Sequence, residues 1–278
     1  MIGWRLMGLL FGLFLAAMPA AGQDVRIHTI AADNGAGRSV PITIVARSGK
    51  ARGVIYFSHG ALSAPAKYSA ITHWWARSGY AVIAPLHADS TDWTGSKPAR
   101  SDQTEWRLAD MRLARQHTAM LLKAVRVRAD RAPVVAAGHS YGALVAMLDR
   151  DPNVRAIIAF SPPGALPGLS VPVVTRPLLT ITGTADVLPM IAPTWQAHLA
   201  GHDNAAGLAI ACVGEGVDHY FGGIFGRPEL PGPRQQEQFD TAMGQSFRFI
   251  AAFAPSFGAA SGTIASLTGQ GCRVRGQN

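Results

Sequence analysis

Short apolar runs rich in β-branched residues alternate along this chain with longer segments in which apolar residues recur every three or four positions. The alternation predicts a mostly parallel sheet covered by helices on both faces, because strands buried on both sides read as nearly continuous apolar runs. Strands are expected at residues 25–30, 40–46, 53–57, 80–85, 133–137, 154–160, 178–182 and 207–213. Helices are expected at residues 66–78, 103–128, 141–150, 194–199 and 237–254.

The pattern contains no internal repeat and no linker between two series of elements, so residues 23–278 are expected to form a single domain. With 48% hydrophobic and 15% charged residues among 278, the chain can bury a sizeable core, which excludes a mostly disordered protein or a coiled coil. The connection at 161–177 is short and rich in proline and glycine. It leaves no room for a helical lid domain.

The first 22 residues have the pattern of a signal peptide. Arg5 is their only charge, residues 6–17 form an apolar run, and residues 18–22 offer small side chains to a signal peptidase. An uncleaved membrane anchor is the alternative, but the run is well short of the roughly 20 residues that a spanning helix needs. We therefore expect a secreted or periplasmic mature protein without a transmembrane segment.

Export gives the two cysteines a structural meaning. Cys212 lies in an apolar run and Cys272 near the C-terminus, and in an oxidising compartment they can form a disulfide that attaches the tail to the domain. The alternative is a buried thiol at Cys212 and an exposed thiol at Cys272. Two cysteines are too few for a zinc site built from four thiolates, and no metal is expected.

The strongest local motif is Gly138-His139-Ser140-Tyr141-Gly142, which has the form G-x-S-x-G. An apolar strand leads into it and an apolar helix follows, which is the strand–turn–helix context of a nucleophile elbow. The serine backbone of such a turn is strained and neighbouring segments pass close by, so the turn needs its glycines. Ser140 is therefore the candidate nucleophile, and an ordinary serine in a strand-to-helix turn is the plainer alternative.

A serine hydroxyl needs a base, and the base needs a carboxylate that orients it. In folds with this elbow the order along the chain is serine, acid, histidine. Asp186 and His219 each follow a predicted strand, so both are expected at the sheet edge where Ser140 lies. Asp218 is the alternative acid, but as the direct neighbour of His219 it approaches the imidazole Nδ1 less easily.

A His59-Gly60 pair follows the predicted strand at 53–57. Such a pair lets the next backbone N–H face a substrate carbonyl oxygen. The N–H groups of Ala61 and Tyr141 are therefore the candidate oxyanion donors, and a simple turn at His59-Gly60 is the alternative.

Other residues near these loops have plainer expected roles. His198 and His202 lie on or just after a helix and are expected at the surface, and His139 is expected to pack or hydrogen bond inside the elbow. Apolar residues flank each candidate loop, among them Leu62 and Phe221. They either line a substrate pocket or belong to the core.

The chain carries a formal net charge of +8, and many of its basic residues lie between Arg107 and Arg131. A nucleic-acid site would interleave aromatic residues with a basic groove, so no nucleic-acid partner is expected. These charges are expected to form a solvated helix face, with weak adsorption to anionic lipid or polymer as the alternative.

Over nearly all of residues 23–278 the chain resembles the α/β-hydrolase superfamily. The segment 58–90, the sequence Arg107-Leu108-Ala109-Asp110 and the elbow resemble, in the same order, the group of predicted dienelactone hydrolases and platelet-activating-factor-acetylhydrolase-like proteins. This resemblance implies serine hydrolysis of carboxylic esters without a metal or cofactor. Dienelactone hydrolases proper use cysteine where this chain has Ser140, so a dienelactone substrate is not implied.

The sequence thus predicts an exported serine esterase that acts on a small-molecule or lipid-like ester through Ser140, His219 and Asp186 and an acyl-enzyme. A thioesterase, a lipase, a polyester depolymerase or a peptidase would use the same three residues. A non-catalytic binding protein on the same scaffold is the alternative from another class. The sequence indicates neither the natural substrate nor the oligomeric state.

Overall fold

The computed structural model describes residues 25–33, 37–129, 132–164, 170–229, 232–255, 265–268 and 272–275. Its strands are β1 (Val25–Asp33), β2 (Ser39–Arg47), β3 (Gly49–Lys50), β4 (Val54–Ser58), β5 (Ala81–Pro85), β6 (Val127–Arg128), β7 (Val134–His139), β8 (Val154–Phe160), β9 (Leu178–Gly183), β10 (Ala209–Gly214) and β11 (Cys272–Arg275). Its α-helices are α1 (Ser69–Arg77), α2 (Gln103–Gln116), α3 (Thr118–Ala124), α4 (Tyr141–Leu148), α5 (Ala200–Asp203), α6 (Gln236–Phe253) and α7 (Ala265–Thr268). Short 3₁₀ helices are η1 (Pro65–Tyr68), η2 (Arg100–Asp102) and η3 (Trp195–Leu199).

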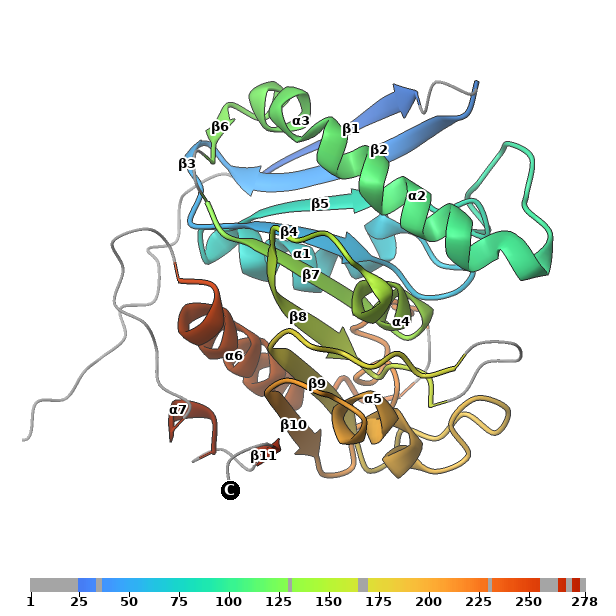
Figure 1. The fold of residues 1–278 in the computed structure, drawn as a ribbon, viewed down its shortest axis with the longest axis vertical. Coiled ribbons are helices and arrows are strands. Elements are labelled where there is room, and N and C mark those ends of the chain that lie inside the picture. Colours follow the sequence, from blue (N-terminus) through green and yellow to red (C-terminus); the bar gives the residue numbers. More distant parts are fainter. Residues whose placement is uncertain are drawn as a thin grey trace, which may run out of the picture.

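A twisted sheet of nine strands forms the centre of the described structure, in the order β1-β2-β5-β4-β7-β8-β9-β10-β11 (Figure 1). The strands from β5 through β4, β7, β8 and β9 to β10 are parallel, whereas β1, β2 and β11 join in antiparallel fashion. Parallel strands place their carboxyl ends at one edge, so the loops after β4, β7, β9 and β10 meet there.

Helices cover both faces of this sheet (Figure 1). α1 and α6 pack beside each other on one face, and α2 and α4 on the other. Successive side chains of β4 alternate between the two cores: Ile55 contacts the cluster that contains Trp75, and Tyr56 contacts the cluster that contains Met111. The predicted architecture, a mostly parallel sheet between two helical layers, is confirmed. No helix lies between β8 and β9 among the described residues, in agreement with the expected absence of a lid domain.

The helix predicted at 103–128 is wrong in its extent. The segment forms two helices, α2 and α3, and then the short strand β6, which pairs with β3. At the break, the Thr118 hydroxyl donates to the carbonyl groups of Ala114 and Arg115. Back-bonding of this kind competes with the helical ladder and bends helices, and helical periodicity does not reveal it.

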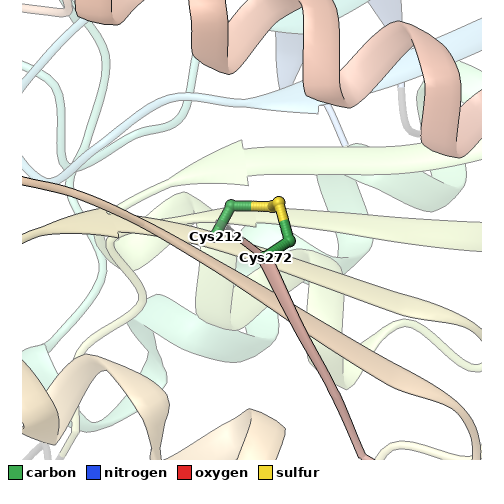
Figure 2. The surroundings of a disulfide bond; sticks show 2 residues. All are labelled: Cys212 and Cys272. Carbon is green, nitrogen blue, oxygen red and sulfur yellow. A yellow bond between two sulfur atoms is a disulfide. The ribbon is translucent and has the colours of Figure 1, made fainter. Parts of the chain in front are cut away.

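The disulfide joins two neighbouring strands at the end of the sheet (Figure 2). Cys212 of β10 and Cys272 of β11 are direct cross-strand partners, and their sulfur atoms are bonded. The predicted pairing of Cys212 with Cys272 is confirmed. Because β11 is the last described strand, this bond attaches the C-terminal segment to the sheet.

The expected signal peptide at residues 1–22 lies outside the described residues. Among the helices that the structure describes, none combines the length and the apolar composition that crossing a bilayer requires.

Candidate active site

Ser140 lies at the turn between β7 and α4, where the backbone is strained. Its φ is +53°, in the left-handed region that serine adopts rarely. The flanking glycines are required by close contacts, because a Cβ at Gly138 would lie 2.2 Å from the Gly142 carbonyl oxygen. A Cβ at Gly142 would lie 1.9 Å from the Ser58 carbonyl oxygen of β4. The turn therefore has the geometry of a nucleophile elbow, with Ser140 at the N-terminus of α4.

Asp186 and His219, from the loops after β9 and β10, meet at the same sheet edge. The imidazole Nδ1 of His219 lies 2.8 Å from the Asp186 Oδ1, and both side chains are buried. The Nε2 atom of His219 is buried and has no hydrogen-bond partner within the described residues. In the neutral tautomer that donates its Nδ1–H to the carboxylate, Nε2 carries a free lone pair that can accept a proton.

Asp186 is held by several donors. Its Oδ2 accepts hydrogen bonds from the Ser161 hydroxyl and, at 3.2 Å, from the Thr182 hydroxyl. Burial alone would raise the pKa of Asp186, but hydrogen bonds from His198 and His219 outweigh burial and hold that pKa well below its ordinary value. The carboxylate is therefore ionised and oriented at neutral pH. Sequence reasoning missed Ser161 and Thr182, because neither lies in a recognisable motif.

His198 contradicts the expectation that it is a surface residue. Its side chain is fully buried, and its Nε2 lies 2.9 Å from Asp186 Oδ1, the atom that also faces His219. His202 is 4% exposed and is also not a surface residue. The expectation failed because η3 and α5 are short and fold against the loop after β8, where His198 Nδ1 donates to the Pro162 carbonyl.

Asp218, the alternative acid, has a different role. One of its carboxylate oxygens accepts the backbone N–H groups of Tyr220 and Gly222, at 2.8 and 3.0 Å. This is a turn-capping arrangement of the kind that aspartate commonly makes. The structure thus brings Asp186, and not Asp218, to the Nδ1 atom of His219.

His139 connects the elbow to the two other loops, as the expected hydrogen-bonding neighbour. Its Nε2–H donates to the His219 carbonyl at 2.9 Å, and its Nδ1 lies 2.8 Å from the Tyr68 hydroxyl. That hydroxyl also accepts the Gly60 N–H at 2.9 Å. Burial, with His219 beside it, holds the pKa of His139 well below its ordinary value. The neutral ring therefore completes a buried chain from Gly60 to His219.

The candidate oxyanion donors lie in the loop after β4 and at the start of α4. Tyr141 is the first residue of α4, so its N–H has no acceptor within the helix. Ala61 follows Gly60, where any Cβ would lie 2.7 Å from the Tyr68 hydroxyl. Positive φ angles occur in the loops after β4, β7, β8 and β10, at Leu62 (58°), Ser140 (53°), Ser161 (46°) and Phe221 (51°). Strained backbone of this kind gathers at functional sites.

The apolar residues that flank these loops divide into two groups. Leu62, Val187 and Met190 are exposed, by 57, 47 and 88%. Phe221 is buried and packs against Phe225 and therefore belongs to the core. The exposed members provide apolar surface on the loops that carry the oxyanion and acid residues.

Asp186, His198 and His219 place ligand-type atoms within 4.8 Å of one another, which is the size of grouping that could hold a metal ion. The two imidazole nitrogens are, however, 2.9 and 2.8 Å from the carboxylate oxygen, which are hydrogen-bond distances. The arrangement is that of one aspartate flanked by two histidines, and we assign no metal to it.

The family model described as serine aminopeptidase, S33 (Hydrolase_4) matches residues 49–209, more than half of the 278. The matched range includes Ser140 and Asp186 and ends before His219. No curated protein matches the chain significantly.

Two solved structures are similar. An acylaminoacyl peptidase from Pyrococcus horikoshii has a TM-score of 0.61 and 12% identity over 88% of this chain and 44% of its own. TT1662 from Thermus thermophilus has a TM-score of 0.48 and 18% identity over 70% of this chain and 91% of its own. This chain thus spans less than half of the acylaminoacyl peptidase, and the likeness concerns the fold alone.

Proposed function

The chain belongs to the serine aminopeptidase S33 family of the α/β-hydrolase superfamily, and we propose that it is an exported esterase with Ser140 as its nucleophile. The observation that carries this proposal is the 2.8 Å hydrogen bond between His219 Nδ1 and Asp186 Oδ1, on the sheet edge where the elbow holds Ser140. A base oriented by a buried carboxylate beside a strained serine is what nucleophilic attack by a hydroxyl requires.

In the proposed reaction, Ser140 Oγ attacks the ester carbonyl carbon while His219 Nε2 takes the hydroxyl proton. No hydrogen bond joins Ser140 Oγ to His219 Nε2 among the described residues, and we expect this contact to form when substrate binds. The N–H groups of Ala61 and Tyr141 stabilise the oxyanion of the tetrahedral intermediate, and Asp186 stabilises the imidazolium. The proton then passes to the leaving alcohol, which departs and leaves Ser140 acylated. Water, deprotonated by His219, attacks the acyl group, and release of the acid returns the proton to Ser140 Oγ.

An ester is preferred to a peptide as substrate for two reasons. The first is the resemblance of segment 58–90 and of the elbow to esterases of the dienelactone-hydrolase-like group. The second is that an aminopeptidase must hold the α-ammonium group of its substrate with a carboxylate. Two carboxylates in the loops around Ser140 are already engaged: Asp89 pairs with Arg107, and Asp218 accepts backbone N–H groups. The family description makes peptide hydrolysis the second candidate.

The test compares matched ester and amide substrates. The assay compares three proteins: wild type, Ser140→Ala, and the control Ser101→Ala, which changes an exposed serine of η2. The ester substrates are p-nitrophenyl esters of increasing acyl length, and the amide substrates are the p-nitroanilides of alanine and N-acetylalanine. We expect ester hydrolysis by wild type and Ser101→Ala that is lost in Ser140→Ala. The acyl length that gives the fastest hydrolysis then indicates the size of the acyl-binding pocket. Faster cleavage of the anilides than of the esters would establish the peptidase candidate instead.

If a folded wild type is inactive on all these substrates, labelling with a fluorophosphonate decides whether the protein is a hydrolase at all. A label on Ser140 supports a hydrolase with another substrate, such as a thioester or a polyester. No label would support the binding-protein alternative.

Export is the part of the proposal that concerns residues 1–22, and the Cys212–Cys272 disulfide supports it, because such bonds persist in oxidising compartments. N-terminal sequencing of protein recovered from the periplasm or medium of an expressing bacterium tests it. We expect a mature N-terminus close to Gln23, and an uncleaved chain retained in the cells would contradict export.

A further inference from the structure

The segment Arg107-Leu108-Ala109-Asp110 of α2 has no part in the proposed reaction, yet two of its charged residues are buried. Arg107 is 1% exposed, so it does not belong to the solvated basic face expected from the sequence, and Asp110 is fully buried. A buried guanidinium is costly unless its donors are paired. The partners of Arg107 therefore show what this segment does.

The Arg107 guanidinium binds the loop that carries the candidate oxyanion donor. Its Nη1 donates to the His59 carbonyl at 2.6 Å, and its Nη2 donates to the Gly60 carbonyl at 3.1 Å. Its Nε and Nη2 also donate to Oδ1 and Oδ2 of Asp89, at 2.8 and 2.7 Å. Asp89 in turn accepts the backbone N–H of Leu62 at 3.3 Å. The ion pair thus holds this turn on both sides of Ala61.

The bond to Gly60 also helps to fix the direction of the Ala61 N–H, together with the His59 Nδ1–H at 2.8 Å and the Ser63 N–H at 3.3 Å, which donate to the same carbonyl. The Gly60 carbonyl and the Ala61 N–H belong to one planar peptide, and no peptide is cis in the described residues. In a trans peptide the C=O and N–H point in opposite directions. Holding the carbonyl toward Arg107 therefore directs the Ala61 N–H away from α2, and rotation of the peptide would break the bond to the guanidinium.

The same guanidinium contacts the second candidate donor. It lies over the ring of Tyr141, 4.5 Å from its centroid. The Tyr141 hydroxyl also lies 2.6 Å from the hydroxyl of Thr104, which belongs to the first turn of α2. α2 therefore holds both segments that supply an oxyanion N–H.

Asp110, one turn further along α2, supports the same loop through His87. The Asp110 Oδ2 accepts the His87 Nδ1–H at 2.9 Å, and His87 Nε2 accepts a hydrogen bond from the Ser58 hydroxyl at 2.8 Å. The backbone N–H of His87 donates to His59 Nε2 at 3.0 Å. This set repeats the hydrogen-bond order of a serine, a histidine and an aspartate, but all three are fully buried, so it is structural.

We propose that Arg107, together with Asp89, is a positioning pair that sets the direction and spacing of the two oxyanion N–H groups, of Ala61 and Tyr141. Burial works to raise the pKa of Asp89, and the Arg107 guanidinium outweighs it and keeps the carboxyl ionised. The inference rests on the proposed serine hydrolysis. It gives the Arg107 side chain a role in the transition state without contact between Arg107 and substrate.

The same helix offers a matched control. Arg115, two turns after Arg107, pairs with Asp149, and its guanidinium lies over the ring of Tyr56, 5.1 Å from the centroid. Its side chain is 12% exposed, and its ion pairs with Asp149 and Asp151 and its ring contact with Tyr56 all lie outside the candidate active-site loops that the structure describes. Arg107→Lys and Arg115→Lys therefore each remove a planar guanidinium that can donate two parallel hydrogen bonds, and each keeps the positive charge.

The first readout does not depend on activity. Hydrogen exchange of a peptide covering residues 58–64 is followed by mass spectrometry in wild type and both variants. We expect faster exchange in Arg107→Lys and no change in Arg115→Lys. If Arg107→Lys does not fold, Asp89→Asn replaces it, because it keeps the side-chain shape and weakens the same pair. Unchanged exchange in a folded variant overturns the proposal.

The second readout separates the transition state from substrate binding. On the best p-nitrophenyl ester, Arg107→Lys should lower kcat by about 10²-fold, the usual cost of a lost oxyanion donor, with KM nearly unchanged. Affinity for a trifluoromethyl ketone, whose adduct places an oxyanion in the same site, should fall by a similar factor. Arg115→Lys should change neither. A loss of kcat without loss of ketone affinity, or equal losses in both variants, overturns the inference.

These outcomes are distinct from failure of the proposed function. Retention of ester hydrolysis by Ser140→Ala would refute Ser140 as nucleophile, whatever the behaviour of Arg107. Loss in Ser140→Ala, together with wild-type kinetics in Arg107→Lys, would leave the function intact and refute the positioning pair alone.

Discussion

His198 lies with its Nε2 atom 2.9 Å from Oδ1 of Asp186, the same oxygen that the candidate base His219 contacts at 2.8 Å. The Nδ1 atom of His198 lies 2.8 Å from the Pro162 carbonyl, so both of its nitrogens face oxygen acceptors. Burial works to lower the pKa of His198, but the hydrogen bond and charge of Asp186 outweigh burial and raise it. A raised pKa favours the protonated form of His198, and the positive charge of that form would offset part of the Asp186 charge felt by His219.

His198→Gln should move the acid limb of the pH–rate profile to higher pH. Glutamine keeps an N–H for Asp186 but removes the positive charge, so Asp186 then favours protonated His219 more strongly and the neutral base forms only at higher pH. The measurement is kcat/KM for a p-nitrophenyl ester from pH 5 to 9. His202→Gln, which removes a buried histidine paired with Asp203, is the control and should leave the limb in place. A flat profile in wild type would contradict a histidine base.

Asp186→Asn should lower kcat by roughly 10⁴-fold, because the amide stabilises neither the Nδ1–H tautomer nor the imidazolium. Asp218→Asn tests the alternative acid and should change kcat by only a few fold, since Asp218 caps the turn at Tyr220 and Gly222. Steady-state kinetics on one ester, with circular dichroism to verify folding, are sufficient. The reverse order of effects would assign the acid to Asp218.

The paired substitution Cys212→Ser and Cys272→Ser should lower the free energy of unfolding by about 4 kcal/mol by the chain-entropy estimate for a bond with a sequence separation of 60. Urea denaturation of wild type, reduced wild type and the double variant measures the loss. Reduced wild type and the double variant should agree, because both lack the cross-link. Equal stability of all three would show that the cross-link does not stabilise the cooperative fold.

Gly142→Ala should destabilise the protein by more than about 3 kcal/mol, because the new Cβ would overlap the Ser58 carbonyl, a backbone atom in a central strand that cannot move away. Gly244→Ala in α6 is the matched control. Its Cβ meets only the end of the Arg248 side chain, at 3.3 Å, and alanine favours the helix by up to about 1 kcal/mol. Thermal unfolding compares the two. A stable Gly142→Ala variant would contradict the close approach of the elbow to β4.

The elbow and the acid and base candidates could be found in the sequence because their signals are local. Gly138, Ser140 and Gly142 lie within five residues between an apolar strand and an apolar helix. Asp186 and His219 each follow a strand, and parallel strands bring their carboxyl ends to one edge. The choice between Asp186 and Asp218 rested on stereochemistry at His219, and the geometry agrees with that choice. Their catalytic roles stay predictions until the variants are measured.

The burial of charged and polar side chains could not be predicted from local sequence signals. Arg107 was assigned to a solvated face and His198 to the surface, because both lie on segments whose polarity is typical of exposed helices. In the structure, each is buried by contacts with residues far away in sequence, Asp89 and Gly60 in one case and Asp186 and Pro162 in the other. Such long-range pairs leave no periodic signal.

The sequence by itself determined the layered α/β architecture, the strained turn at Ser140, and the chain order of serine, acid and histidine. Hydrophobic periodicity and the conformational needs of glycine are properties of short segments, so they can be read directly. Only the tertiary structure decided that Asp186 is shared by His198 and His219, and that Arg107 holds the oxyanion loop. Those contacts depend on which strand ends meet, and the packing of the whole sheet determines that.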